Sequence, residues 1–225
     1  MGYALVRNVV SPDSIDSLLS HYLRLVHEVT GRAFTDPFGA DLVEYFDAHR
    51  DEESEIYLRI RDKPWLEEFS RQAGIVAAIR GIVDAPCALF RKIPFRIDMP
   101  QWVHELALWH QDYFYVRGNT EVITAWIPLQ DVTYLNGCLS VMPRSHLLGP
   151  VEHDLQIGKK SVPSSIFGGE MRMVEMRKGD MLIFSALMLH SSNLNLSNSI
   201  RYSVQARYTP VGKPIDPAMG GSVQL

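Results

Sequence analysis

Cysteine is scarce in this chain: Cys87 and Cys138 are the only two, and they do not form a Cys-x-x-Cys motif. Two isolated thiols indicate neither a disulfide framework nor a zinc knuckle, and they fit a reducing, cytoplasmic location. No Lys/Arg run is longer than a pair such as Lys159-Lys160, and the formal net charge is -4, so a nucleic-acid partner is not expected. No apolar stretch approaches the roughly 20 residues that cross a bilayer, so no membrane partner is expected either.

The composition is that of an ordinary globular protein, with 225 residues of which 46% are hydrophobic and 21% charged. This is enough chain for one sizeable core, and we expect a single domain over residues 1–225. After a short apolar strand at residues 3–6, Ser11 and Pro12 predict a helix start and Gly31 predicts its end. Apolar residues continue at helical spacing, which predicts a helical part over about residues 10–84.

From about residue 86 to 210 the pattern changes to short apolar segments separated by Gly, Pro and Asn turns. Strands are predicted at residues 88–97, 107–115, 121–128, 139–142, 171–176, 181–184 and 200–208. Many short strands at this spacing indicate a sandwich or a barrel. The polar stretch 148–169 predicts a long loop over one mouth of that barrel.

Two ligand-type side chains, His110 and Asp112, fall in a segment predicted as a strand. Alternation along a strand places both on one face, about 7 Å apart at ~3.3 Å per residue. His190, at the end of a later strand, offers a third ligand. Two histidines and one carboxylate form the facial triad typical of non-haem Fe(II), with three positions left for co-substrate and oxygen. A lone histidine is more often a hydrogen-bonded core residue, and His-x-Asp is frequent by chance, so these residues alone are weak evidence.

Arg201, eleven positions after His190, strengthens the hypothesis. On the predicted strand that it begins, Arg201, Ser203, Gln205 and Arg207 share one face, and apolar residues share the other. Polar residues that face a barrel interior need a ligand, and a guanidinium pairs bidentately with the distal carboxylate of a diacid. The alternative role for Arg201 is a salt bridge in the core.

Taken in order, four motifs resemble those of the phytanoyl-CoA dioxygenase family of Fe(II)/2-oxoglutarate oxygenases. They are Trp109-His110-Gln111-Asp112, Ile123-Thr124-Ala125-Trp126-Ile127-Pro128-Leu129, Asn136-Gly137-Cys138-Leu139 with Pro143-Arg144-Ser145-His146, and His190-Ser191-Ser192-Asn193 with Arg201. The family often has glycine where Arg144 stands. The opening residues 2–11 also resemble the family's start, so we expect a complete catalytic fold. The resemblance implies an α+β, mainly β, fold: a double-stranded β-helix (jelly-roll, cupin-like) core with N-terminal helices packed on one sheet.

The resemblance also implies roles for individual residues. His110, Asp112 and His190 match the iron ligands, which are the catalytic residues, and Arg201 matches the base that binds the C5 carboxylate of 2-oxoglutarate. Ser192 matches a hydroxyl that shares this carboxylate and Trp126 an aromatic beside the co-substrate; a loop-capping hydroxyl and plain core packing are their alternatives. Lys92, Arg96 and Arg59 are candidates for the family's further co-substrate ligands.

The implied activity is oxidation, most simply hydroxylation, of a small-molecule substrate, with O2 consumed and succinate and CO2 released. Asp112 keeps the carboxylate that related halogenases replace by a small residue. Desaturation, cyclisation or epimerisation would use the same residues, and the motifs fix neither the substrate nor the oligomeric state. Two other functions stay open: a cupin-like isomerase or hydrolase with another divalent metal, and a non-catalytic metabolite-binding module.

Substrate contacts are expected from polar and aromatic residues near the motifs. The candidates are Arg96, Gln101, His104, Tyr113, Arg144 and Gln205, with Asp98, Trp102, Tyr115 and the loop 152–169 as further contributors. Arg96, His104 and Lys159 suit an anionic substrate, whereas Trp102, Tyr113 and Tyr115 suit a ring or an acyl chain. Each one taken singly can equally be an ordinary surface or core residue.

Overall fold

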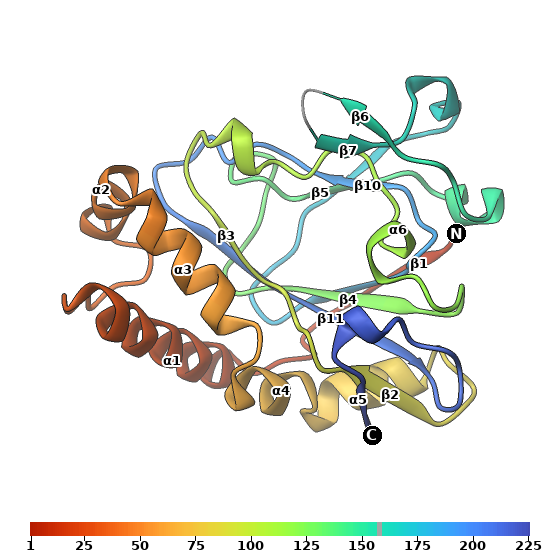
Figure 1. The fold of residues 1–225 in the computed structure, drawn as a ribbon, viewed down its shortest axis with the longest axis horizontal. Helices are drawn as coiled ribbons and strands as arrows, with labels where there is room; N and C mark the ends of the chain where they lie inside the picture. Colours follow the sequence, from red (N-terminus) through yellow and green to blue (C-terminus); the bar gives the residue numbers. More distant parts are fainter. Residues whose placement is uncertain (157–158) are drawn as a thin grey trace.

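The structure, a computed structural model, describes residues 1–156 and 159–225 and has an α+β fold (Figure 1). Its helices are α1 (Pro12–Thr30), α2 (Ala40–Ala48), α3 (Arg50–Ile60), α4 (Pro64–Ser70), α5 (Ala73–Arg80) and the single turn α6 (Tyr113–Val116). Short 3-10 turns are η1 (Val103–Glu105), η2 (Ser145–Leu148), η3 (Ser164–Ile166) and η4 (Pro217–Met219). None of the helices in the described part of the chain combines the length and apolar character needed to span a bilayer.

The strands pair in antiparallel fashion throughout the described residues. They are β1 (Tyr3–Val6), β2 (Cys87–Phe90), β3 (Phe95–Asp98), β4 (Ile123–Pro128), β5 (Leu139–Val141), β6 (Asp154–Gln156), β7 (Lys159–Ser161), β8 (Arg172–Val174), β9 (Met181–Ser185), β10 (His190–Ser192), β11 (Arg201–Pro210) and β12 (Ser222–Gln224). A seven-stranded sheet has the order β1-β9-β4-β11-β2-β12, with β3 also paired to β11. A second sheet has the order β10-β5-β8, and β6 pairs with β7.

Helices α1 to α5 lie on one side of the seven-stranded sheet, and β5 and β10 lie on the other (Figure 1). Alternate residues of β4 show how the sheet separates two cores. Ala125 and Ile127 join the large cluster that contains the helix side chains, whereas Trp126 packs with the residues of β5. The same alternation holds along β11, where Tyr202 and Val204 belong to the helix side. The polar residues of β11 therefore face the space between the two sheets, as predicted.

Helix α1 begins and ends where the sequence predicts. The Ser11 hydroxyl accepts a hydrogen bond from the Ser14 amide, and Pro12 occupies the first turn. Gly31 follows the helix with φ 69°, a left-handed backbone that costs glycine little. Strand β1 also has its predicted bounds.

Two strand predictions and one loop prediction are wrong in part. The predicted strand 107–115 is interrupted: His110 makes an isolated bridge, and Asp112 has helical angles (φ -59°, ψ -31°) because its carbonyl accepts the Val116 amide at the start of α6. The predicted strand 88–97 is two strands, β2 and β3, separated by a segment that contains Pro94, which has no amide to donate. The predicted loop 148–169 contains the β6–β7 pair and η3; residues 157 and 158 lie outside the described part.

Candidate metal centre

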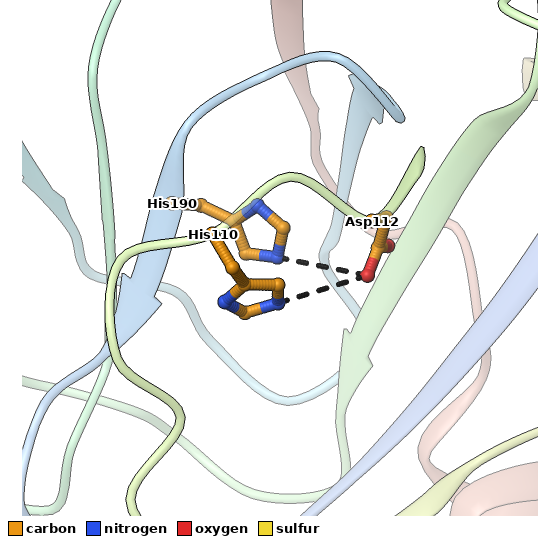
Figure 2. A group of neighbouring side chains, drawn as sticks. All are labelled: His110, Asp112 and His190. Atoms are coloured by element: carbon orange, nitrogen blue, oxygen red, sulfur yellow. Dashed lines mark ion pairs between the residues drawn. The ribbon is translucent and has the colours of Figure 1, made fainter. Parts of the chain in front are cut away.

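His110, Asp112 and His190 converge, and their side chains point toward one another (Figure 2). One nitrogen or oxygen atom from each lies within 4.8 Å of the other two. Nε2 of His110 is 3.8 Å and Nε2 of His190 is 4.0 Å from Asp112 Oδ1. A metal ion bound at about 2 Å from each ligand fits three donors at this spacing, so the sequence prediction that these residues lie together is confirmed.

Backbone pairing places the two histidines side by side. The His110 amide donates to the His190 carbonyl at 3.0 Å, and the His190 amide donates back at 3.1 Å. Nδ1 of His110 lies 2.6 Å from the Leu108 carbonyl oxygen, and Nδ1 of His190 lies 3.0 Å from that of Met188. Each carbonyl favours a proton on Nδ1, which leaves the lone pair of Nε2 free to bind a metal ion.

The pKa of His190 also favours metal binding. Burial lowers its pKa to about 4, and the neighbouring His110 acts in the same direction. The imidazole is therefore neutral near pH 7, which is the form that binds a cation.

Asp112 is held from two sides by groups that sequence reasoning gave no role at the metal centre. Nη2 of Arg207 donates to Oδ1 at 2.9 Å and Nε approaches Oδ2 at 3.4 Å, while the Thr124 hydroxyl donates to Oδ2. Burial alone raises the pKa of Asp112, but Arg207, His110 and His190 outweigh it and hold this pKa well below the usual range. The carboxylate is thus ionised and fixed in orientation.

Gln111, between the two ligands, supports the centre from behind. Its side chain is fully buried and donates to the carbonyls of Gly149 and Leu187, and its oxygen accepts the Val151 amide. Its own amide donates to Nε2 of His153. Nothing in the sequence identified these partners of Gln111.

A cavity of about 480 Å³ opens beside the three ligand residues, a size suited to small molecules. Its lining includes the three ligand residues and, in addition, Tyr57, Arg61, Pro94, Arg96, His104, Leu106, Ala107, Leu108, Tyr115, Trp126, Leu139, Lys159, Lys160, Ser192, Gln205 and Arg207. Trp126, Ser192, Arg96, His104 and Gln205 are therefore brought together as the sequence analysis expected.

Arg201 is not among the residues that line this cavity. It is 1% exposed, pairs through Nη1 with Asp98 Oδ2 at 3.0 Å and donates to the Ser203 hydroxyl at 3.0 Å. Its guanidinium carbon is 5.4 Å from the ring centre of Trp126. Nε and Nη2 of Arg201 and Nε1 of Trp126 are buried without a hydrogen-bond partner among the described residues. Burying a donor without an acceptor costs free energy, so these three atoms are available to an acceptor group.

Three substrate candidates lie outside this cavity, which corrects the sequence analysis. Tyr113 is the first residue of α6 and packs against the cluster that contains Phe90 and Val116. Gln101 is exposed beside Trp102, in a separate surface hollow. Arg144 is exposed, with φ 70°, at the start of η2.

The positive φ of Arg144 explains a position where the resembled family often has glycine. Among the co-substrate candidates, Arg96 lines the cavity and pairs with Asp98 at 3.2 Å, whereas Arg59 and Lys92 are not lining residues. Arg59 lies on the exposed side of α3 and pairs with Glu55.

The geometry agrees with comparison to known proteins. The model of the family described as phytanoyl-CoA dioxygenase matches residues 1–203. The chain belongs to this family. Two curated proteins that are similar to this chain in sequence are 1-deoxypentalenic acid 11-beta-hydroxylase of Streptomyces arenae and a probable phytanoyl-CoA dioxygenase of Caenorhabditis elegans. The first is 35% identical over 113 residues, 45% of this chain and 40% of the relative.

The Caenorhabditis elegans relative is 26% identical over 160 residues, which is 65% of this chain and 51% of the relative. The matches thus span about half or less of these phytanoyl-CoA dioxygenase-family relatives. Solved structures with the same fold include AviO1 of Streptomyces viridochromogenes, with a TM-score of 0.65, 19% identity and coverage of 95% of this chain and 91% of the other.

The non-heme monooxygenase ThoJ in its apo form has a TM-score of 0.67 at 16% identity and covers 93% of this chain and 74% of its own. The epimerase SnoN, solved with Fe3+, alpha ketoglutarate and nogalamycin RO, has a TM-score of 0.57 at 20% identity, with coverage of 93% and 79%. At these identities the likeness shows a shared fold.

Proposed function

We propose that this chain is a 2-oxoglutarate-dependent non-haem iron oxygenase that oxidises a small molecule. The observation that carries the proposal is the set of His110, Asp112 and His190, with three ligand atoms within 4.8 Å beside a cavity of about 480 Å³. Two imidazoles and one carboxylate leave metal positions open for other ligands, as Fe(II) oxygenases require. Family membership supports the same chemistry.

The polar groups of Arg201, Trp126 and Ser192 fit the co-substrate. A distal carboxylate would accept from Nε and Nη2 of Arg201, the two guanidinium nitrogens that have no acceptor, and from the indole Nε1 of Trp126. Ser192 lies on the cavity wall, two residues after His190 on the same face of β10. We assign Arg201, Ser192 and Trp126 to the binding of 2-oxoglutarate. We also assign Arg96 to this co-substrate site, because it pairs with the same Asp98 as Arg201.

We place the catalytic unit in one domain over residues 1–225, in which the seven-stranded sheet and the β10-β5-β8 sheet form a double-stranded β-helix and the helices pack on the seven-stranded sheet. The first strand and the last strand belong to the same seven-stranded sheet, which supports this assignment. A cytoplasmic location is part of the proposal, since Cys87 and Cys138 are both buried free thiols.

Bound iron and 2-oxoglutarate would supply the oxidation of a substrate C–H bond by O2, with release of succinate and CO2. The chain's own contribution is binding and orientation. Arg207 and Thr124 hold the Asp112 carboxylate, and the carbonyls of Leu108 and Met188 orient the imidazoles.

Anaerobic titration of the purified protein with Fe(II) and 2-oxoglutarate tests the proposal. We expect the weak visible charge-transfer band of iron chelated by a 2-oxo acid, saturating at one equivalent of each, and we expect its loss in His190→Ala. His21→Ala, at a partly exposed histidine of α1 that is not among the residues lining the cavity, is the matched control and keeps the band. Metal binding without the band would favour a cupin-like isomerase or hydrolase, and no metal binding would favour a metabolite-binding module.

A further inference from the structure

The charged side chains that line the cavity are almost all of one sign. Arg61, Arg96, Lys159, Lys160 and Arg207 are cationic, and Asp112 is the only carboxylate among the described lining residues. They come from segments far apart in the sequence: the end of α3, β3, β7 and β11. A cavity lined by one sign of charge concentrates ligands of the opposite sign.

Three of these cations already have partners on the protein. Arg207 pairs with Asp112, and Arg96 pairs with Asp98, an acid shared with Arg201. Nζ of Lys159 donates to the carbonyls of Val103 and Leu106, which ties β7 to the η1 segment. These three cations therefore shape the cavity, and their charge is at least partly balanced.

Arg61 and Lys160 differ from those three. Nε of Arg61 is buried without a hydrogen-bond partner among the described residues, and its guanidinium carbon lies 5.9 Å from the ring centre of Tyr57. Nζ of Lys160 lies 5.6 Å from the ring centre of Phe114. No ion pair joins either cation to a carboxylate in the described part of the chain.

Exposure shows at which end of the cavity these cations lie. Asp112 and His190 are buried, Arg61 is partly exposed, and Lys160 and His104 are exposed. Arg61 and Lys160 therefore lie nearer the solvent than the metal centre does. The lining also contains Leu106, Leu108, Pro94, Leu139 and Tyr115, which offer apolar and aromatic contacts.

We propose that the substrate is an anionic amphiphile, whose carboxylate or phosphate group binds Arg61 and Lys160 at the solvent end of the cavity while its apolar body extends toward the metal centre. This assignment rests on the proposed oxygenase function and adds the substrate class to it. Tyr57 precedes Arg61 by one helical turn and supports the guanidinium, so that its unpaired Nε can donate to the anion.

A matched set of six-carbon probes tests this inference: hexanoate, hexyl phosphate, 1-hexanol and hexylammonium. Each is titrated into anaerobic protein saturated with Fe(II) and 2-oxoglutarate, and binding is followed by tryptophan fluorescence, since Trp126 lines the cavity. We expect at least one anionic probe to bind about tenfold more tightly than 1-hexanol, and added salt to reduce the difference. The two anionic probes distinguish a carboxylate from a phosphate substrate.

Variants of α3 provide the matched comparison. Arg61→Gln should weaken the anionic probes about tenfold and leave 1-hexanol unchanged. Arg61→Glu should shift the preference to hexylammonium. Arg59→Gln removes a cation from the same helix, but Arg59 is paired with Glu55 and lies outside the cavity, so all four affinities should stay the same.

The inference is overturned if 1-hexanol or hexylammonium binds wild-type protein as tightly as the anions, or if Arg59→Gln and Arg61→Gln have equal effects. Failure of the oxygenase proposal gives a different result, because the charge-transfer band would then be missing. Fluorescence still reports on the probes in that case.

Discussion

Arg207 and Arg201 lie on the same face of β11 but have different surroundings. Arg207 forms a two-point contact with the Asp112 carboxylate, whereas Arg201 pairs with Asp98 and retains two nitrogens without acceptors. A guanidinium on a ligand carboxylate fixes which oxygen faces the metal and offsets part of the negative charge. The unused donors of Arg201 are the reason that we propose it as the group that binds the distal carboxylate of 2-oxoglutarate.

Replacing Arg207 should therefore affect the metal. We expect Arg207→Gln to weaken Fe(II) binding about 10- to 100-fold, as loss of a group that orients a ligand commonly does. Anaerobic Fe(II) titration measures this, with Arg172→Gln as control, because Arg172 pairs with Glu170 at the surface. Equal Fe(II) affinities for Arg207→Gln and wild type would show that Thr124 alone is sufficient to hold Asp112.

Replacing Arg201 should affect the co-substrate. We expect Arg201→Gln to weaken 2-oxoglutarate about tenfold or more with little change in Fe(II) affinity, because a charge-assisted two-point contact is lost. The measurement is the midpoint of the charge-transfer band against 2-oxoglutarate concentration. If Arg201 were only a core salt bridge to Asp98, the variant would lose stability while that midpoint stayed constant.

At the scale of elements, the segment from His110 to α6 shows how tertiary pairing determines local structure. Its aromatic residues favour a strand, yet the chain makes one bridge to β10 and then turns into a helix. Gln111 stabilises this change by joining the segment to the backbone at Gly149, Val151 and Leu187. The spacing of His110 and Asp112 thus depends on a buried amide between them.

Gln111→Leu should consequently destabilise the protein. The substitution keeps a side chain of similar length but leaves the Gly149 and Leu187 carbonyls and the Val151 amide without this partner. We expect a loss of about 2–3 kcal/mol in the free energy of unfolding, measured by urea denaturation. Gln224→Leu, on exposed β12, is the control and should change it by less than about 0.5 kcal/mol. A similar loss in both variants would contradict the assigned role.

For the whole molecule, buried histidines relate stability to pH. Burial lowers the pKa of His190 to about 4 from an ordinary 6.5, and it also lowers the pKa of His153 and of His146. Below pH 6.5 the unfolded chain binds protons that the folded chain does not, so the free energy of unfolding decreases as pH falls. Asp112 acts at lower pH, because its pKa is already below its ordinary value of 3.8.

We therefore expect metal-free protein to lose stability steadily between pH 6.5 and about 4. Urea denaturation at pH 7, 6 and 5 in the presence of a chelator measures this decrease. His153→Gln should make the decrease shallower, since one of the buried titrating groups is removed. Constant stability from pH 7 to pH 5 would contradict the prediction.

Local patterns were sufficient to predict several parts of the fold. The start and end of α1, the bounds of β1 and the polar face of β11 all follow from the residue types within each segment. The three ligand residues were also identified, because the motifs around them resemble a family to which the chain belongs. The bounds of the interrupted strands could not be predicted. Whether a segment forms a continuous strand or a single bridge depends on which strand it pairs with in the folded protein.

By itself, the sequence determined which faces are polar, where helices begin and which residue types can bind a metal, because alternation and capping act over a few residues. Only the tertiary structure decided which of these groups meet. Asp112 and Arg207 are 95 positions apart, and Arg201 reaches Asp98 across paired strands. Such contacts depend on strand order and register, which the packing of the whole chain fixes.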